Sequence, residues 1–231
     1  MNSKNEFLKG ISPNFRNEII FNLDRYTDSS LQLGLTTGLM AKALQNGYIA
    51  KYEKPIVIQG LLISINNKII LGLRNKPKFR EKLSDEKNDF KLMLCPAGYA
   101  TFNKEGSLIR SFYKELKEEI GLYEKDIDNI KIFGHNHDVN FTEGIRITYI
   151  VFVNLSFNEI KKRWLKADHN WEYLGLIGLD TKKEGMRTFM KAKDFSCYHK
   201  RAKGIIDSSI KPVFNSLILD NNCGFEILRK I

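Results

Sequence analysis

The chain has 231 residues, of which 42% are hydrophobic and 28% are charged, and its formal net charge is +10 at neutral pH. This length and hydrophobic content suffice to bury a full core, and they favour one core with extensions over two equal domains. No apolar run reaches the roughly eighteen residues needed to span a bilayer, and the N-terminus lacks an apolar signal core. We therefore expect neither a membrane segment nor a signal peptide.

The elements that precede the most informative motif are mainly strands. Residues 1–54 are predicted to form an ordered elaboration packed on the core, with a helix over 39–46. Two β-rich runs follow, 56–65 and 68–74, and the Asn-Asn pair between them is typical of a tight hairpin. A short strand over 91–95 is then broken at Pro96, and a polar loop runs to Gly106.

The remaining elements alternate between strands and helices. Residues 130–133 and 145–153 are predicted strands, and the apolar end of the second suits a central strand covered on both faces. A capped amphipathic helix is predicted over 156–166, a strand over 171–179, and a helix over 203–219 that is broken or kinked near Pro212. This order predicts an α/β/α sandwich with a mixed sheet, in which 55–180 is the core and 181–231 a helical extension of the same domain.

A group of carboxylates follows the polar loop. Ser107 is placed to cap a helix, on which Glu115, Glu118 and Glu119 stand at positions i, i+3 and i+4, with Gly121 as the stop. On an α-helix the three side chains lie within about 100° of one another, and Glu119 lies about 60° from the centre of the apolar stripe, so it is partly desolvated. Such oxygen ligands favour Mg²⁺ or Mn²⁺. The alternative is a solvated helix face with lysines interleaved.

This stretch resembles one half of the signature of the Nudix hydrolase superfamily, which runs Gly, five residues, Glu, seven residues, Arg-Glu-apolar-x-Glu-Glu-x-Gly-apolar. Residues 114–122 match its C-terminal half position for position, with Lys114 in place of Arg. In the N-terminal half, the expected Gly and Glu fall on Ala100 and Gly106, whereas the chain offers Gly98 and Glu105. A loop longer by two residues restores Gly98, and Glu105 then becomes the expected partner of Lys114 in a brace across the loop.

The resemblance implies a Nudix-type fold and a metal-dependent hydrolase that cleaves the pyrophosphate bond of a nucleoside diphosphate linked to another group. The expected cofactor is Mg²⁺, for which Mn²⁺ can substitute. The expected metal ligands are Gly98, through its backbone carbonyl, Glu115, Glu118 and Glu119. The expected catalytic residues are Glu115 and Glu118, with Asp168 and Glu172 as candidates for a further ligand or the base, and the expected substrate-binding residues are Arg74 and Lys114.

The substrate is less defined by the sequence than the reaction. The N-terminal extension, residues 33–38 and residues 167–172 are similar in layout to the branch that splits UDP-glucose or UDP-galactose into UMP and sugar 1-phosphate. Phe79 or Tyr99 is then expected to stack the base. Two alternatives stay open: an inactive Nudix-like nucleotide-binding or regulatory module, against which the intact glutamates argue, and an RNA-directed enzyme of the decapping type. Dimers are common in this superfamily.

Other features of the sequence carry less information. Basic residues gather over 74–82 and 191–203, where they can steer a polyanionic substrate, contact RNA phosphates or simply form a solvated surface. His135 and His137 are spaced to point the same way on a strand, but no third ligand accompanies them. No Walker loop, G-x-S-x-G elbow or G-x-G-x-x-G fingerprint is present, so those enzyme classes gain no support.

Cysteine usage indicates the compartment. Cys95, Cys197 and Cys223 are widely spaced, odd in number and form no C-x-x-C pair. Isolated cysteines of this kind are typical of reduced thiols, so we predict a cytoplasmic protein. Cys95 follows a predicted strand near the glutamate motif, where a buried core role is more common than a nucleophilic one.

Overall fold

The computed structural model describes residues 18–27, 30–37, 54–75, 90–137, 145–192, 204–206 and 210–219. The chain divides into two compact units. The first comprises Met1–Gln59, Ala97–Lys114 and Phe133–Thr148, and the second comprises Gly60–Pro96, Glu115–Ile132 and Tyr149–Ile231. The helix expected over 39–46, Phe79, Cys197, Cys223 and most of the two basic runs lie outside the described residues, as do the side chains of His135 and His137.

Three strands contribute residues to both units. They are β3 (Ile56–Ile63), β7 (Ile127–His137) and β8 (Ile145–Val153). Every residue of β3 and β8 is buried. This confirms the expectation that β8 is covered on both faces. Hydrogen bonding links eight strands in the order β10 (Gly204–Ile206), β5 (Phe90–Leu94), β4 (Lys68–Asn75), β3, β8 and β7, with β6 (Ala97–Tyr99) paired to β3 and β9 (Tyr173–Asp180) paired to β4.

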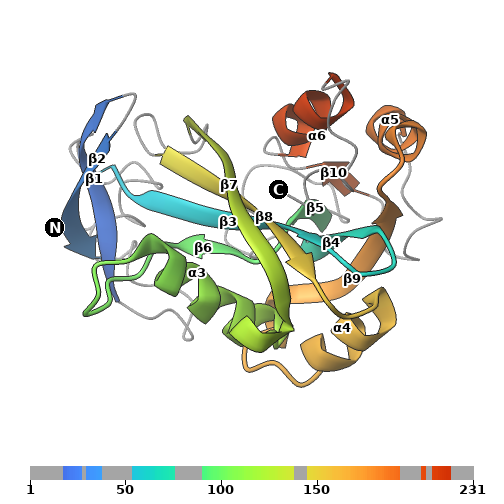
Figure 1. The fold of residues 1–231 in the computed structure, drawn as a ribbon, viewed down its shortest axis with the longest axis horizontal. Helices are drawn as coiled ribbons and strands as arrows, with labels where there is room; N and C mark the ends of the chain where they lie inside the picture. Colours follow the sequence, from blue (N-terminus) through green and yellow to red (C-terminus); the bar gives the residue numbers. More distant parts are fainter. Residues whose placement is uncertain are drawn as a thin grey trace, which may run out of the picture. The chain divides into compact units, whose positions relative to one another are not determined.

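The first unit contains an antiparallel hairpin of β1 (Ile19–Thr27) and β2 (Ser30–Thr37), drawn in blue in Figure 1. The short strand β6 (Ala97–Tyr99) pairs antiparallel with the start of β3. The Phe21 N–H donates to the Ala100 carbonyl at 2.7 Å, and the Ala100 N–H donates to the Ile56 carbonyl at 2.8 Å. The loop predicted after Pro96 therefore begins with a strand, because the backbone groups of Ala97–Tyr99 find partners on β3.

Helix α3 (Leu108–Glu115) follows this loop, close to the predicted start. Asn103 fixes the approach, since its Oδ1 accepts from the Ser107 N–H at 3.0 Å and its Nδ2 donates to the Ser107 carbonyl at 2.7 Å. Phe112 is fully buried, and the Ser111 hydroxyl accepts from the Thr101 N–H at 2.7 Å. The apolar stripe and one buried hydroxyl thus hold this helix against the strand region that precedes it.

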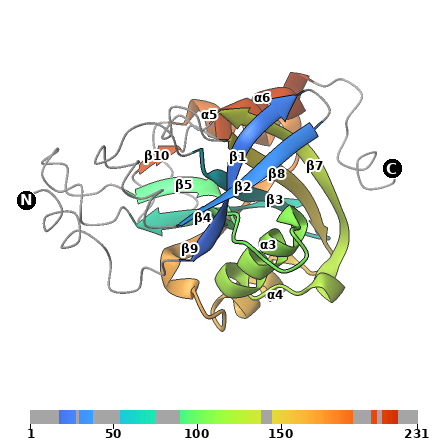
Figure 2. The same ribbon diagram turned by 90° about the vertical axis from the view of Figure 1, so that its left-hand side faces the viewer.

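The second unit contains a mixed sheet, so the expected α/β class is confirmed. Strand β10 (Gly204–Ile206) runs parallel to β5 (Phe90–Leu94), and β5 runs antiparallel to β4 (Lys68–Asn75). Strand β9 (Tyr173–Asp180) is also antiparallel to β4, as is the end of β3. Figure 2 shows β4 beside β5. The predicted hairpin is present, and its turn places Asn67 in the left-handed region at φ 55°, which asparagine tolerates.

Helices and short turns complete this unit. Its turns are η2 (Leu116–Ile120), η3 (Glu124–Asp126) and η4 (Asn170–Glu172), and its helices are α4 (Phe157–Trp164), α5 (Lys183–Lys191) and α6 (Ile210–Leu219). Ser156 caps α4, which confirms the predicted capped helix, and the cap is a capping box with Glu159. Figure 1 shows α5 beside α6, where the Phe189 and Phe214 rings lie 5.9 Å apart.

The prediction of one helix over 203–219 is wrong at its start. Residues 204–206 form β10, because their backbone pairs with β5, and the helix begins only at Ile210. Pro212 therefore falls in the first turn, where a missing N–H removes no helical hydrogen bond. Among the described residues, none of the helices is long and apolar enough to cross a membrane.

Candidate functional site

The expected glutamates lie on a helix that changes its winding. Helix α3 ends at Glu115 and continues directly into η2, which is a π-helical turn over Leu116–Ile120. A π-turn is wider than an α-turn, so Glu118 and Glu119 do not stand at the α-helical angles to Glu115 that the spacing suggested. Turns of this kind inside helices are frequent at functional sites.

Gly121 follows the last residue of this turn, and two observations explain why the position requires glycine. Its φ of 73° lies in the left-handed region, as is common after the last helical residue. A Cβ at this position would also lie 2.7 Å from the backbone carbonyl oxygen of Arg163 on α4. Gly121 therefore lets α4 approach the end of the glutamate-bearing turn closely.

Glu119 is the most unusual carboxylate among the described residues. Its exposed fraction is 1%, and the Tyr173 hydroxyl donates to its Oε2 at 2.6 Å. Burial raises the pKa of Glu119 well above its ordinary value, and the nearby carboxylates of Glu172 and Glu115 raise it further. Arg74 and the Tyr173 hydrogen bond act in the opposite direction. The predicted partial desolvation of Glu119 is thus confirmed, and the burial is nearly complete.

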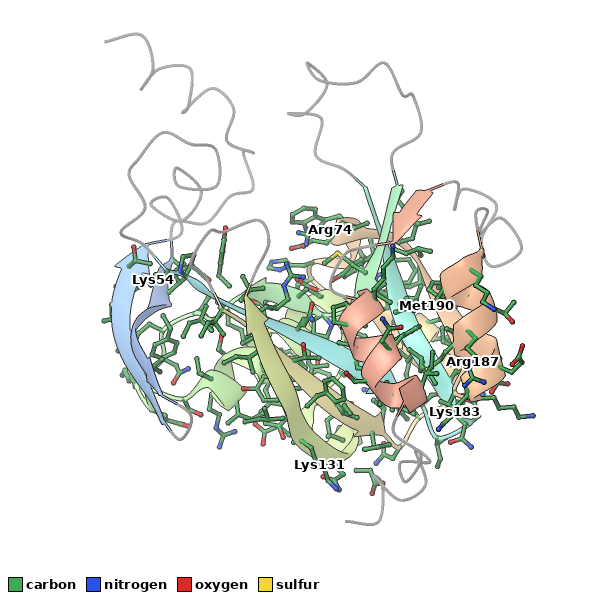
Figure 3. All side chains as sticks on the ribbon, turned by 90° about the horizontal axis from the view of Figure 1, so that it is seen from above. Lys54, Arg74, Lys131, Lys183, Arg187 and Met190 are labelled. Atoms are coloured by element: carbon green, nitrogen blue, oxygen red, sulfur yellow. The ribbon has the colours of Figure 1, made fainter. Side chains whose placement is uncertain are left out.

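An ion pair stands next to Glu119. The Arg74 Nη2 atom lies 2.5 Å from the Glu172 Oε2 atom, with side chains that are 37% and 14% exposed. Burial lowers the pKa of the Arg74 guanidinium, but Glu172, Glu119 and Glu115 more than offset this and raise it above the ordinary value. Arg74 is therefore a fixed positive charge among three carboxylates. Figure 3 labels Arg74 on β4.

The pairing of β4 with β9 brings Tyr173 and Arg74 to this place. The register shifts between Leu73 and Arg74, so that Leu73 lies opposite Gly175 and Arg74 lies opposite Tyr173. Such an irregularity redirects side chains at the end of a strand pair. The Tyr173 ring then covers Gly72, where a Cβ would lie 2.4 Å from the ring. Glycine at position 72 makes room for the ring that reaches Glu119.

Tyr173 belongs to the candidate site, although the sequence did not predict it there. Burial raises the pKa of its hydroxyl well above the ordinary value, and Glu119 adds to this effect, so the hydroxyl keeps its proton and remains a donor. In the sequence, Tyr173 is one aromatic residue in an apolar strand pattern, and nothing there distinguishes it from a core residue. Its role depends on the strand register, which the pattern does not predict.

Glu118 lies against the turn that carries the other candidate acids. Its backbone carbonyl accepts from the His169 N–H at 2.7 Å, and its Oε2 lies 3.5 Å from the His169 Nδ1 atom. Asp168 is exposed on the same turn, whereas Glu172 belongs to the ion pair with Arg74. Of the two predicted acids, Glu172 is therefore the one that joins the Glu119 cluster.

Two expected site residues belong to the first unit. Gly98 lies on β6, opposite Ile58. The Lys114 Nζ atom lies 2.8 and 2.9 Å from the two carboxylate oxygens of Glu18. The expected brace between Glu105 and Lys114 is wrong, because Glu105 instead pairs with Arg110 at 2.9 Å. Glu105 stands on an exposed turn just before the helix, from which Arg110 in its first turns is the nearer partner.

Cys95 is a buried free thiol. Its Sγ atom lies 3.7 Å from the Ile70 carbonyl oxygen. Burial raises the pKa of this thiol well above its ordinary value, and Glu119 raises it further. A neutral, fully buried thiol is a poor nucleophile, which agrees with the interpretation of Cys95 as a core residue.

The donor chemistry of this cluster fits a hard divalent cation. Glu115, Glu118, Glu119 and Glu172 offer only oxygen ligands. Burial raises the pKa of Glu119 most, and a cation would relieve the repulsion from Glu172 and Glu115 that raises it further. Within the described ranges, no three His, Cys, Asp or Glu side chains already stand together as a ligand set. Coordination by this cluster would therefore involve new rotamers of the less buried glutamates.

Comparison with known proteins gives a limited result. No family model and no curated protein matches the chain. The solved structure of DR0079 from Deinococcus radiodurans is 11% identical with a TM-score of 0.43, over 75% of this chain and 88% of that one. A NUDIX family hydrolase from Clostridium perfringens is 15% identical, with a TM-score of 0.38 over 71% and 96% of the two chains. A mutT/nudix family protein from Listeria innocua is 16% identical, with a TM-score of 0.38 over 71% and 97%.

At these identities and TM-scores, the likeness carries no argument about the site or the activity.

Proposed function

We propose that this chain is a divalent-metal-dependent hydrolase of the Nudix type, which cleaves the pyrophosphate bond of a nucleoside diphosphate linked to another group. The observation that supports this best is the buried Glu119 carboxylate, held by Tyr173 beside the Arg74–Glu172 pair. Crowding carboxylates in a buried place is unfavourable for stability. Side chains with strongly shifted pKa values are concentrated at functional sites.

The residues of the cluster have distinct roles in this proposal. Mg²⁺ held by Glu115, Glu118 and Glu119 would neutralise phosphate oxygens and lower the pKa of an attacking water. Arg74 stays charged and presents a guanidinium suited to phosphate oxygens, while Glu172 is the candidate to accept a proton from water. Tyr173 holds the orientation of the Glu119 carboxylate. Lys114 and the carbonyl of Gly98 remain predicted members of the site.

For the substrate we propose a UDP-sugar as the first candidate, cleaved to UMP and sugar 1-phosphate. The support is the layout of residues 33–38 and 167–172, and the latter include the turn that carries Glu172. Mn²⁺ is expected to replace Mg²⁺, and a cytoplasmic location is proposed from the isolated cysteines. The net charge of +10 keeps an RNA substrate as the competing class.

A substrate panel tests the proposal. Purified protein with Mg²⁺ is given UDP-sugars, ADP-ribose, NADH, dinucleoside polyphosphates, deoxynucleoside triphosphates and capped RNA, and the products are separated. We expect nucleoside monophosphate release from a small nucleotide and none in the presence of EDTA. Cleavage restricted to capped RNA would replace the small-molecule proposal with the RNA-directed one. Nucleotide binding without turnover of any compound would point to a binding module.

A further inference from the structure

Trp171 is an exposed tryptophan next to the carboxylate cluster. Its exposed fraction is 54%, whereas the other tryptophan of the chain, Trp164, is 8% exposed. Single exposed apolar side chains are common on proteins, so exposure alone does not define a site. The surroundings of Trp171 supply the further observations.

Hydrogen bonds hold the backbone on both sides of Trp171. His169, two residues before Trp171, donates its N–H to the Glu118 carbonyl at 2.7 Å, and the Glu172 N–H donates to the His169 carbonyl at 3.0 Å. The Glu172 side chain is in turn paired with Arg74. The indole is therefore carried by an ordered turn, η4, and a ligand that contacts it loses little free energy in ordering a loop.

His169 connects the indole to the glutamates. Its ring centroid lies 5.9 Å from that of Trp171 at an interplanar angle of 58°, and its Nδ1 atom lies 3.5 Å from the Glu118 Oε2 atom. One imidazole ring thus separates an exposed flat surface from the carboxylate of Glu118, which the motif makes an expected metal ligand. All of these residues belong to the second unit.

We propose that Trp171, supported by His169, is the platform on which the base of the nucleoside diphosphate stacks. This inference rests on the proposed function, which places the phosphates at the carboxylate cluster. A nucleobase is flat, and aromatic side chains stack on bases with little preference for their identity. The platform therefore recognises a nucleotide through its base while leaving the choice of base to other groups. Trp171 takes the role that the sequence suggested for Phe79 or Tyr99.

Binding measurements test this platform apart from catalysis. UMP, AMP and inorganic pyrophosphate are titrated with Mg²⁺ against wild type, Trp171→Ala, Trp171→Phe and the control Leu165→Ala, which removes another exposed side chain, 62% exposed, near the same turn. We expect Trp171→Ala to weaken both nucleotides by about 5- to 150-fold, the range for loss of one stacked base. Pyrophosphate affinity should stay unchanged, because it has no base, and Trp171→Phe should retain most of the nucleotide affinity.

Tryptophan fluorescence gives a second readout of the same contact. A stacked base should quench the wild-type emission, and this quenching should be lost in Trp171→Phe, since the remaining Trp164 is buried. Nucleotide affinity that is equal in Trp171→Ala and wild type would overturn the platform, as would an absence of nucleotide binding in the wild type. The proposed hydrolysis fails separately, if wild type binds nucleotides through Trp171 but cleaves none of the panel.

Discussion

At the scale of single residues, Glu119 and Tyr173 explain why this helix end differs from an ordinary acidic surface. A solvated carboxylate needs no partner, but Glu119 is 1% exposed and has the Tyr173 hydroxyl at 2.6 Å. The side chain therefore has one fixed orientation. Groups that hold a metal-ligating side chain in place commonly matter almost as much as the ligand itself.

Removing the Tyr173 hydroxyl should weaken metal binding. We expect Tyr173→Phe to lower the affinity for Mn²⁺ by about 10- to 100-fold, because the Glu119 carboxylate loses the donor that orients it. Electron paramagnetic resonance of free Mn²⁺ measures the affinity directly. Tyr123→Phe, at a 47% exposed position, is the matched control and should bind Mn²⁺ like wild type. Equal affinities in all three proteins would remove Tyr173 from the site.

The raised pKa of Glu119 predicts a pH dependence of stability in metal-free protein. A carboxyl whose pKa is higher in the folded than in the unfolded state stabilises the fold fully below its unfolded pKa, and this contribution is lost as the pH rises through the folded pKa. The amide of Glu119→Gln has no such titration. The unfolding free energy of Glu119→Gln relative to wild type should therefore increase from acidic to neutral pH in EDTA. Urea denaturation across this range measures it, and parallel curves would contradict the assignment.

At the scale of elements, the sequence predicted one hairpin, several single strands and the glutamate helix, but not how the other strands pair. The hairpin around Asn67, the capped α4 and the buried β8 all follow from local patterns. The π-turn and the register shift at Arg74 do not, because both depend on tertiary contacts across long sequence separations. The prediction that Glu105 pairs with Lys114 was wrong for the same reason, because the partner of Lys114 is Glu18, which is distant in sequence.

Gly121, at the end of η2, should tolerate substitution least among the residues at these element boundaries. A side chain there must adopt a left-handed φ of 73° and place its Cβ 2.7 Å from the Arg163 carbonyl oxygen. The neighbouring backbone is held by the Arg163–Asp126 ion pair, with atoms 3.2 and 3.3 Å apart. We expect Gly121→Ala to lower the unfolding free energy by about 2 kcal/mol or more, from left-handed strain and overpacking together. Gly106→Ala shares the positive φ without a nearby atom and should cost less.

At the scale of the whole molecule, the candidate site gathers residues that lie far apart in the chain. Tyr173 and Glu119 are separated by 54 positions, and Arg74 and Glu172 by 98. The proposed chemistry rests on the motif in residues 114–122, whose spacing within one helix is local information. The positions of Tyr173, Gly72 and His169 around it could not be predicted, since they depend on how β4 pairs with β9 and how η4 meets η2.

The measurement that tests the central claim most directly is phosphorus NMR of UDP-sugar hydrolysis with Mg²⁺, comparing wild type, Glu119→Gln and Glu184→Gln. Glu184 is exposed on α5 and serves as the control. We predict that wild type and Glu184→Gln release UMP and sugar 1-phosphate at similar rates, whereas Glu119→Gln is slower by about 100-fold or more, the scale for losing a group that acts on developing charge. Because Glu119→Gln removes a crowded charge and should fold well, turnover equal to wild type in this variant would contradict the claim.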